Sequence, residues 1–115
     1  MYGEGLQLRD YVHVNDVVRA FLVSGIDERT NGQVFNVGSG QPVAFRDMAY
    51  IVIRLAKRGS IKFVEWPADA AQTETGSFVA DISLIKNTIG WSPRISLEDG
   101  LAYVIREYKE HFGIQ

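Results

Sequence analysis

The chain has 115 residues, of which 46% are hydrophobic and 23% are charged, and this length and composition fit one globular domain. A formal charge of −2 argues against nucleic acid and against an anionic membrane as partners, and the absence of cysteine excludes disulfides and thiolate metal sites. No apolar run reaches membrane-spanning length and no signal-peptide core is visible, so we expect a cytoplasmic protein.

The first half of the chain alternates between predicted strands and helices. Leu8–Val14 is rich in β-branched and aromatic residues, which predicts a strand. Apolar residues then recur at helical spacing from Asp16 to about Glu28, with Asn15 as the expected N-cap. Gln33–Val37 predicts a second short strand. After a Gly-Ser-Gly loop, a further helical pattern runs from Phe45 to Ala56.

The second half of the chain becomes helical. Ile61–Trp66 predicts a third strand, and residues 68–76 show no period and are expected to form a loop. Asp81 is expected to cap a short helix that ends near Ile89. Ser96 with Asp99 resembles a capping box for the last helix, on which one apolar stripe is expected to face the core: Leu97, Leu101, Val104, Tyr108 and Phe112. The predicted fold class is α/β leaning to α+β, with a small mixed sheet and four helices.

Five segments follow one another along nearly the whole chain: Gly5–Asp16, Val34–Gly40, Asp81–Ser83, Gly90–Pro93 and Ser96–Leu101. In this order they resemble the C-terminal part of the extended short-chain dehydrogenase/reductase family, that is, the NAD-dependent epimerases and dehydratases of nucleotide sugars. The resemblance implies a single domain over residues 1–115, which is the substrate-side region of a Rossmann-type enzyme. It also implies a fragment that lacks the N-terminal NAD-binding lobe.

The two motifs that carry the chemistry of this family are missing from the sequence. Neither Gly3-Glu4-Gly5 nor Gly38-Ser39-Gly40 is followed by the third glycine of a dinucleotide fingerprint. No tyrosine has a lysine four positions later; Tyr50, for example, has Arg54 there. The resemblance implies NAD in the intact parent, but we expect this chain alone to be inactive, to contribute no catalytic residue and to bind no NAD.

The resemblance assigns substrate binding to Arg9, together with Gln7 and Asn36. In the family, the arginine of this motif binds the diphosphate of the nucleotide sugar, and a guanidinium suits phosphate oxygens because it offers a planar fork of donors. From the residues alone, a surface arginine paired with Asp10 or another carboxylate is favoured, and Asn36 could instead anchor its loop through backbone groups. Gly38-Ser39-Gly40 is either an anion nest or a turn that needs positive φ, and we favour the turn.

Two features depart from the family pattern. Ala44 stands where relatives often have a Ser, Thr or Asn that caps the next helix, so we expect this helix to lack a side-chain cap. No Lys or Arg occurs between Lys62 and Lys86, so the second cation of a phosphate clamp is missing from this chain. The loop offers other polar residues instead: Asp69, Gln72, Thr73 and Glu74. We discount a general acid/base role for its two carboxylates, because loop carboxylates are usually solvated.

We therefore expect the substrate-binding C-terminal region of an NAD-dependent nucleotide-sugar epimerase or dehydratase, without a choice between the two reactions. The alternative is a non-catalytic binding or interaction module that keeps only the fold. The expected partner is a nucleotide-sugar substrate, with no nucleic acid and no membrane. In the family, the first helix and Val34–Val37 pack against the missing lobe, so their exposed apolar surface predicts a homo-oligomer.

Overall fold

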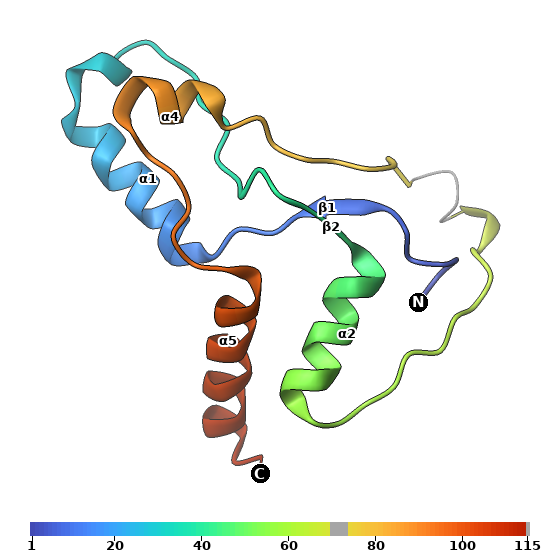
Figure 1. Cartoon of the computed structure of the whole chain (residues 1–115). Coiled ribbons are helices and arrows are strands. Elements are labelled where there is room, and N and C mark those ends of the chain that lie inside the picture. The colour runs from blue at the N-terminus through green and yellow to red at the C-terminus, as the bar shows by residue number, and fades with distance from the viewer. Residues whose placement is uncertain (70–73, 115) are drawn as a thin grey trace.

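A two-stranded sheet and four α-helices make up the part of the chain that the structure describes (Figure 1). The structure is a computed structural model, and it describes residues 1–69 and 74–114. The elements follow in the order β1 (Leu8–Asp10), α1 (Val14–Ile26), the 3-10 helix η1 (Glu28–Thr30), β2 (Pro42–Ala44), α2 (Phe45–Ala56), α4 (Ser83–Ile89) and α5 (Leu97–Phe112). The mixed α/β class that the sequence predicts is confirmed.

β1 and β2 form an antiparallel pair in which Arg9 lies opposite Val43. The pairing extends into the start of α2, because the N–H of Phe45 donates to the carbonyl of Gln7 at 3.0 Å and the N–H of Arg46 donates to that of Gly5 at 2.9 Å. Side chains alternate between the two faces of a strand. Arg9 and its neighbour Asp10 are therefore expected on opposite faces of β1.

The first predicted strand is shorter than expected. It ends at Asp10, opposite Pro42, because the N–H of the next residue, Gln41, donates to Oγ of Ser39 at 3.0 Å instead of continuing the ladder. α1 then begins at Val14, two residues earlier than predicted, and its N-cap is His13 rather than Asn15. The Nδ1 atom of His13 accepts a hydrogen bond of 3.2 Å from the N–H of Asn15.

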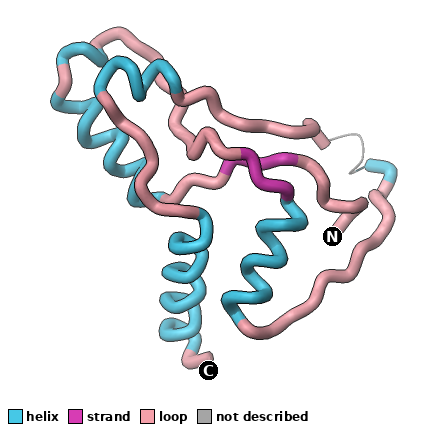
Figure 2. The backbone as a smooth tube through the Cα atoms, viewed as in Figure 1, coloured by secondary structure: helices cyan, strands magenta, loops and turns pink. Residues whose placement is uncertain are grey.

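The strands predicted at Gln33–Val37 and Ile61–Trp66 are wrong. Both segments are extended loops in the part of the chain that the structure describes, apart from one parallel bridge between Tyr2 and Val64. A strand needs a partner for its backbone groups, and among the described residues Gln33–Val37 has none. Val64 pairs only with the start of the chain, by donating to the carbonyl of Met1 at 2.9 Å and accepting from the N–H of Gly3 at 2.8 Å. Figure 2 shows the long loops that connect the helices instead.

The helix predictions agree better with the structure. α2 spans Phe45–Ala56 as predicted, and the hydroxyl of Ser96 caps α5 by accepting from the N–H of Asp99 at 3.1 Å. The carboxylate of Asp81 accepts from the N–H of Ser83 at 2.9 Å, where α4 begins.

The hydrophobic core of the described residues is small. Ala20 of α1, Ile85 of α4 and Trp91 form one buried cluster, while α2 and α5 lie side by side at the other end of the molecule (Figure 1). The radius of gyration is 17.1 Å, against about 13 Å for a compact chain of this length. The chain is thus open rather than compact.

Two apolar helix faces are left uncovered. Phe21 and Ile26 of α1 are 73% and 86% exposed, and Val104, Tyr108 and Phe112 of α5 are all at least half exposed. The prediction that the α5 stripe faces the core is therefore wrong for these three residues, whereas Leu97 and Leu101 are half-buried. Periodicity identifies an apolar face but not what covers it. Within residues 1–69 and 74–114, no helix combines the length and the apolar character needed to cross a membrane.

Candidate functional site

Arg9 on β1 has a carboxylate partner, and that partner is Glu74. Its Nη2 atom lies 2.5 Å from Oε1 of Glu74, and its Nη1 atom donates to the carbonyl of Gly76 at 2.5 Å and to that of Leu8 at 3.0 Å. The side chains of Arg9 and Glu74 are 28% and 24% exposed, so the ion pair is half-buried. The alternative of an arginine paired with a carboxylate is realised in this structure, with Glu74 in the place considered for Asp10.

Residues 74–80, which we call the strap, are hydrogen-bonded along β1. The N–H of Leu8 donates to Oγ of Ser77 at 3.0 Å, and the carbonyl of Leu8 accepts from the N–H of Phe78 at 3.0 Å. The N–H of Ala80 donates to the Asp10 carboxylate at 3.0 Å. These bonds to the N–H and the carbonyl of Leu8 hold the strap against β1, and the strap in turn places Glu74 beside Arg9.

Asp10 binds the Gly-Ser-Gly loop. Its carboxylate accepts from the N–H of Ser39 at 2.6 Å and from that of Gly40 at 2.9 Å, in addition to Ala80. Burial favours a higher pKa for Asp10, but the hydrogen bonds from Ser39, Ala80 and Gly40 outweigh it and hold the pKa below its usual value. The loop thus uses its N–H groups to bind an anion, and that anion is a carboxylate of the same chain.

Gly38 is required by close packing at this point. A Cβ atom on Gly38 would lie 2.6 Å from Cβ of Ala80 and 2.8 Å from Oδ2 of Asp10. Only a residue without a side chain lets the strap, the loop and β1 meet so closely.

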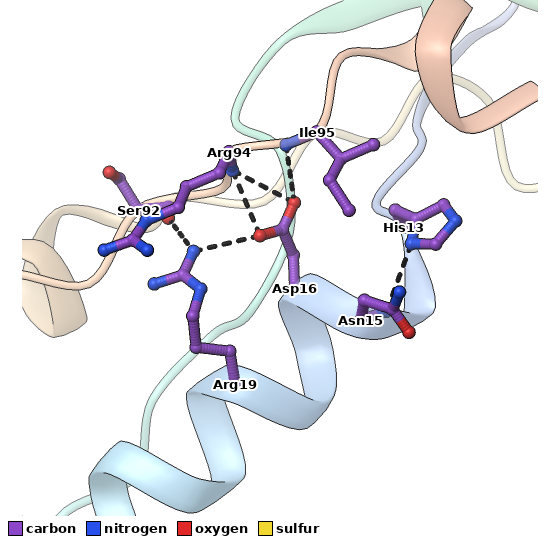
Figure 3. A network of polar contacts seen from close by, with 7 residues as sticks. All are labelled: His13, Asn15, Asp16, Arg19, Ser92, Arg94 and Ile95. Carbon is purple, nitrogen blue, oxygen red and sulfur yellow. Dashed lines mark hydrogen bonds and ion pairs between the residues drawn. The ribbon is translucent and has the colours of Figure 1, made fainter. Parts of the chain in front are cut away.

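Asp16 is the second aspartate of the Gly5–Asp16 segment, and it fixes the entry to α5 (Figure 3). Its carboxylate accepts from the N–H of Arg94 at 3.0 Å, from that of Ile95 at 2.9 Å and from Nη2 of Arg19 at 2.9 Å. Arg19 also donates to the carbonyl of Ser92. Asp16 is 2% exposed, and although burial favours a higher pKa, the hydrogen bonds from Ile95, Arg19 and Arg94 hold the pKa of Asp16 below its usual value.

Sequence reasoning missed the roles of both aspartates. It treated Asp16 only as the first residue of a predicted helix and Asp10 only as a possible partner of Arg9. A buried charge has to be hydrogen-bonded, but both aspartates have polar neighbours in the sequence, Arg9 and Asn15, so no local pattern marks them as buried. The partners themselves are remote in sequence and cannot be read from it.

The other two predicted substrate-binding residues lie at separate points. Gln7 precedes β1 and is half-buried, and its carbonyl is bonded to the start of α2. Asn36 is exposed, and its side chain donates to the carbonyl of Asp81 at 3.4 Å, which anchors its loop. Among the described residues, no hydrogen bond links either side chain to Arg9.

A pocket of about 240 Å³ is lined by Tyr11, Ser39, Gln41, Val43 and residues 93–97, and Arg9 is not among its lining residues. Val43 lies opposite Arg9 in the ladder, so both side chains belong to the same face of the sheet. Burial raises the pKa of Tyr11, and the nearby charge of Arg9 counteracts part of that effect. The Tyr11 hydroxyl is buried without a hydrogen-bond partner in the described part of the chain.

The acidic loop does not form an acid/base pair in this arrangement. Glu74 is bonded to Arg9, and Asp69 is exposed. Gln72 and Thr73 lie outside the described residues. Within residues 1–69 and 74–114, no three His, Asp or Glu side chains are grouped so as to hold a metal ion.

Comparisons with known proteins agree on one kind of enzyme. The model of a family described as GDP-mannose 4,6 dehydratase matches residues 1–104. The chain is 28% identical over 113 residues to a dTDP-glucose 4,6-dehydratase of Streptomyces griseus, and this alignment covers 96% of this chain and 33% of that protein. The chain spans about a third of the length of the curated relatives it matches.

Solved structures give the same result. The UDP-glucose 4-epimerase of Thermotoga maritima, solved with UDP-glucose, matches with a TM-score of 0.84 and 25% identity, over 97% of this chain and 35% of that one. A structure of MoeE5 in complex with UDP-glucuronic acid and NAD matches with a TM-score of 0.83 and 28% identity, over 96% of this chain and 36% of that one.

Proposed function

This chain belongs to the GDP-mannose 4,6 dehydratase family, and on that premise we propose that it is the substrate-binding, C-terminal region of an NAD-dependent nucleotide-sugar epimerase or dehydratase. The observation that carries the proposal is Arg9 itself, a guanidinium held on β1 within residues 1–104, which match the family model. Epimerase and dehydratase chemistry both remain within the proposal.

In this proposal, Arg9 binds the diphosphate of the nucleotide sugar. A guanidinium stays charged at any physiological pH and can donate to two phosphate oxygens at once. Gln7 and Asn36 are proposed to add contacts from their side-chain amides. The Gln7 side chain makes no hydrogen bond among the described residues, and the Asn36 bond of 3.4 Å is long enough to be exchanged for a ligand.

The NAD chemistry is assigned to a region outside this chain. The Gly-Ser-Gly loop, which most resembles a phosphate cradle, lacks the third glycine of the fingerprint, and Asp10 already accepts from its N–H groups. These residues do not fit a dinucleotide. We therefore propose that this chain alone binds no NAD, and calorimetric binding of NAD to the 115-residue chain would contradict the proposal.

The exposed apolar faces support a homo-oligomer of the isolated chain. Phe21 and Ile26 of α1 would be buried between copies, which removes apolar surface from water. A clean monomer in light scattering at high concentration would contradict this part.

The acidic net charge supports the exclusion of nucleic acid and anionic membranes as partners, and the cytoplasmic location stays a prediction.

The test of the function uses the longer protein that the proposal implies. The reading frame should continue upstream of Met1 into a Gly-rich fingerprint and a Tyr-x-x-x-Lys pair. In that protein, Arg9→Ala should raise the KM for the nucleotide sugar by about tenfold or more, because a charge-assisted hydrogen bond is lost, and should leave NAD affinity unchanged.

Arg29→Ala is the matched control. Arg29 is 65% exposed and pairs only with Asp27 among the described residues, so its removal should leave the KM for the nucleotide sugar unchanged. Equal KM values for the wild type and Arg9→Ala would overturn the assignment of Arg9. Absence of any turnover of nucleotide sugars by the longer protein would favour the alternative of a binding or interaction module that keeps only the fold.

A further inference from the structure

The carboxylate of Glu74 occupies the edge of Arg9 that an anionic ligand would use. Oε1 of Glu74 lies 2.5 Å from Nη2 of Arg9, and the same oxygen accepts a hydrogen bond of 3.0 Å from the N–H of Gly76. The second bond fixes the direction of the carboxylate. Nη1 of Arg9 is bonded to two carbonyls, so most of the guanidinium fork is already in use.

Asp10 cannot take over the role of Glu74. Its carboxylate accepts from the N–H groups of Ser39, Gly40 and Ala80, on the other face of β1. Among the described residues, Glu74 is the only acidic side chain that forms an ion pair with Arg9. The charge of Arg9 is thus neutralised by one residue of the strap.

The strap brings no cation to offset that acid. No Lys or Arg occurs between Lys62 and Lys86. A diphosphate placed on Arg9 would therefore meet the Glu74 carboxylate at the same guanidinium, and two anions at that separation repel each other. Either the carboxylate leaves Arg9 or the phosphate does not bind.

We propose that Glu74 is an internal competitor for Arg9, so that a diphosphate binds only by displacing the Glu74 carboxylate. The inference rests on the proposed function of Arg9 and adds a residue that sets the affinity of that site. The exchange is local, because the other strap contacts do not involve Glu74: Ser77 and Phe78 remain bonded to Leu8, and Ala80 remains bonded to Asp10.

The test is a titration of the 115-residue chain with inorganic pyrophosphate, followed by amide NMR. Glu74→Gln keeps the size of the side chain and removes its charge. We expect it to lower the Kd for pyrophosphate about two- to fivefold relative to the wild type, which is the range of partly exposed ion pairs. Glu74→Ala should lower the Kd for pyrophosphate by the same factor. It serves as the second variant if Glu74→Gln changes the amide spectrum beyond the strap.

Asp69→Asn is the matched control, because it removes the same charge from an exposed position five residues earlier in the sequence. It should leave the Kd for pyrophosphate unchanged. In the Arg9→Ala background, Glu74→Gln should no longer lower this Kd. If Arg9→Ala weakens pyrophosphate binding while Glu74→Gln and Asp69→Asn behave alike, the competition is refuted and the role of Arg9 stands. If the wild type, Arg9→Ala and Glu74→Gln all bind equally or not at all, the proposed function fails as well.

Discussion

The carboxylate of Asp16 accepts a hydrogen bond of 2.9 Å from the backbone N–H of Ile95, although the two residues are 79 positions apart. This contact joins the first turn of α1 to the segment that leads into α5. Asp10 makes the equivalent link from β1 to Ala80, 70 positions away. The two aspartates that follow Arg9 in the sequence thus connect the first part of the chain to its last third.

Asp16→Asn should destabilise the fold by about 1–3 kcal/mol. The amide has only one oxygen, so either the N–H of Ile95 loses its acceptor or the new NH2 group faces Nη2 of Arg19, and in both cases Arg19 loses its counter-ion. Urea denaturation followed by circular dichroism measures the change. Asp47→Asn is the control, because this first-turn aspartate of α2 has a side chain that is 59% exposed and should change stability by less than about 0.5 kcal/mol. Equal unfolding midpoints for the two variants would refute the anchoring role.

Stability should fall at acid pH through Asp10 and Asp16. Hydrogen bonds hold both pKa values below the unfolded value of about 3.9, so the unfolded state binds protons first as the pH falls. Their contribution is fully present above about pH 4 and is lost as the pH drops through the folded pKa values. Urea midpoints measured from pH 7 to pH 3 should show this loss, with a shallower fall for Asp16→Asn. Parallel falls in the variant and the wild type would contradict the prediction.

The sequence was sufficient for the helices because their signals are local. The pattern of Phe45–Ala56 and the cap formed by Ser96 and Asp99 lie within one element each, and both are confirmed. The strand at Gln33–Val37 failed because its propensity needs a remote partner, and none is present among the described residues. β2 was missed because three residues that begin with Pro42 carry almost no strand signal.

The site was predictable to the same extent. The ordered segments led to the nucleotide-sugar family, and the match over residues 1–104 confirms it. Arg9 stood out because its residue type fits phosphate. Its pairing with Glu74 joins residues 65 positions apart in the sequence, and no local pattern records that contact.

Gly38→Ala should destabilise the chain by about 1–3 kcal/mol, because the added methyl group would overlap Ala80 and the carboxylate of Asp10. Gly25→Ala is the opposite case. It lies in α1 with open space around it, and the same substitution should stabilise by about 0.5–1 kcal/mol. Thermal melts of the two variants should therefore shift in opposite directions. A Gly38→Ala melt at or above that of the wild type would contradict the close packing of the strap on the loop.

Ala44→Ser should stabilise the start of α2. Ala44 is the N-cap and makes no side-chain cap. The N–H groups of Phe45 and Arg46 already donate to the carbonyls of Gln7 and Gly5. The new serine hydroxyl can therefore accept a hydrogen bond only from the N–H of Asp47. We therefore expect the lower part of the usual range, about 0.5–1 kcal/mol, seen as a higher melting temperature. Ala56→Ser, at the other end of the helix, offers no such cap and should not stabilise. An unchanged or lower melting temperature for Ala44→Ser would refute the prediction.

The central claim is that Arg9 binds the diphosphate of a nucleotide sugar. Its most direct test is an amide NMR titration of UDP into the 115-residue chain and into its Arg9→Ala variant. We predict weak, saturable shifts in the wild type, centred on Arg9 and on the strap amides of Gly76 and Ser77, because the ligand has to displace Glu74. The same amides should not respond in Arg9→Ala. Equal responses of the two chains to UDP would contradict the claim.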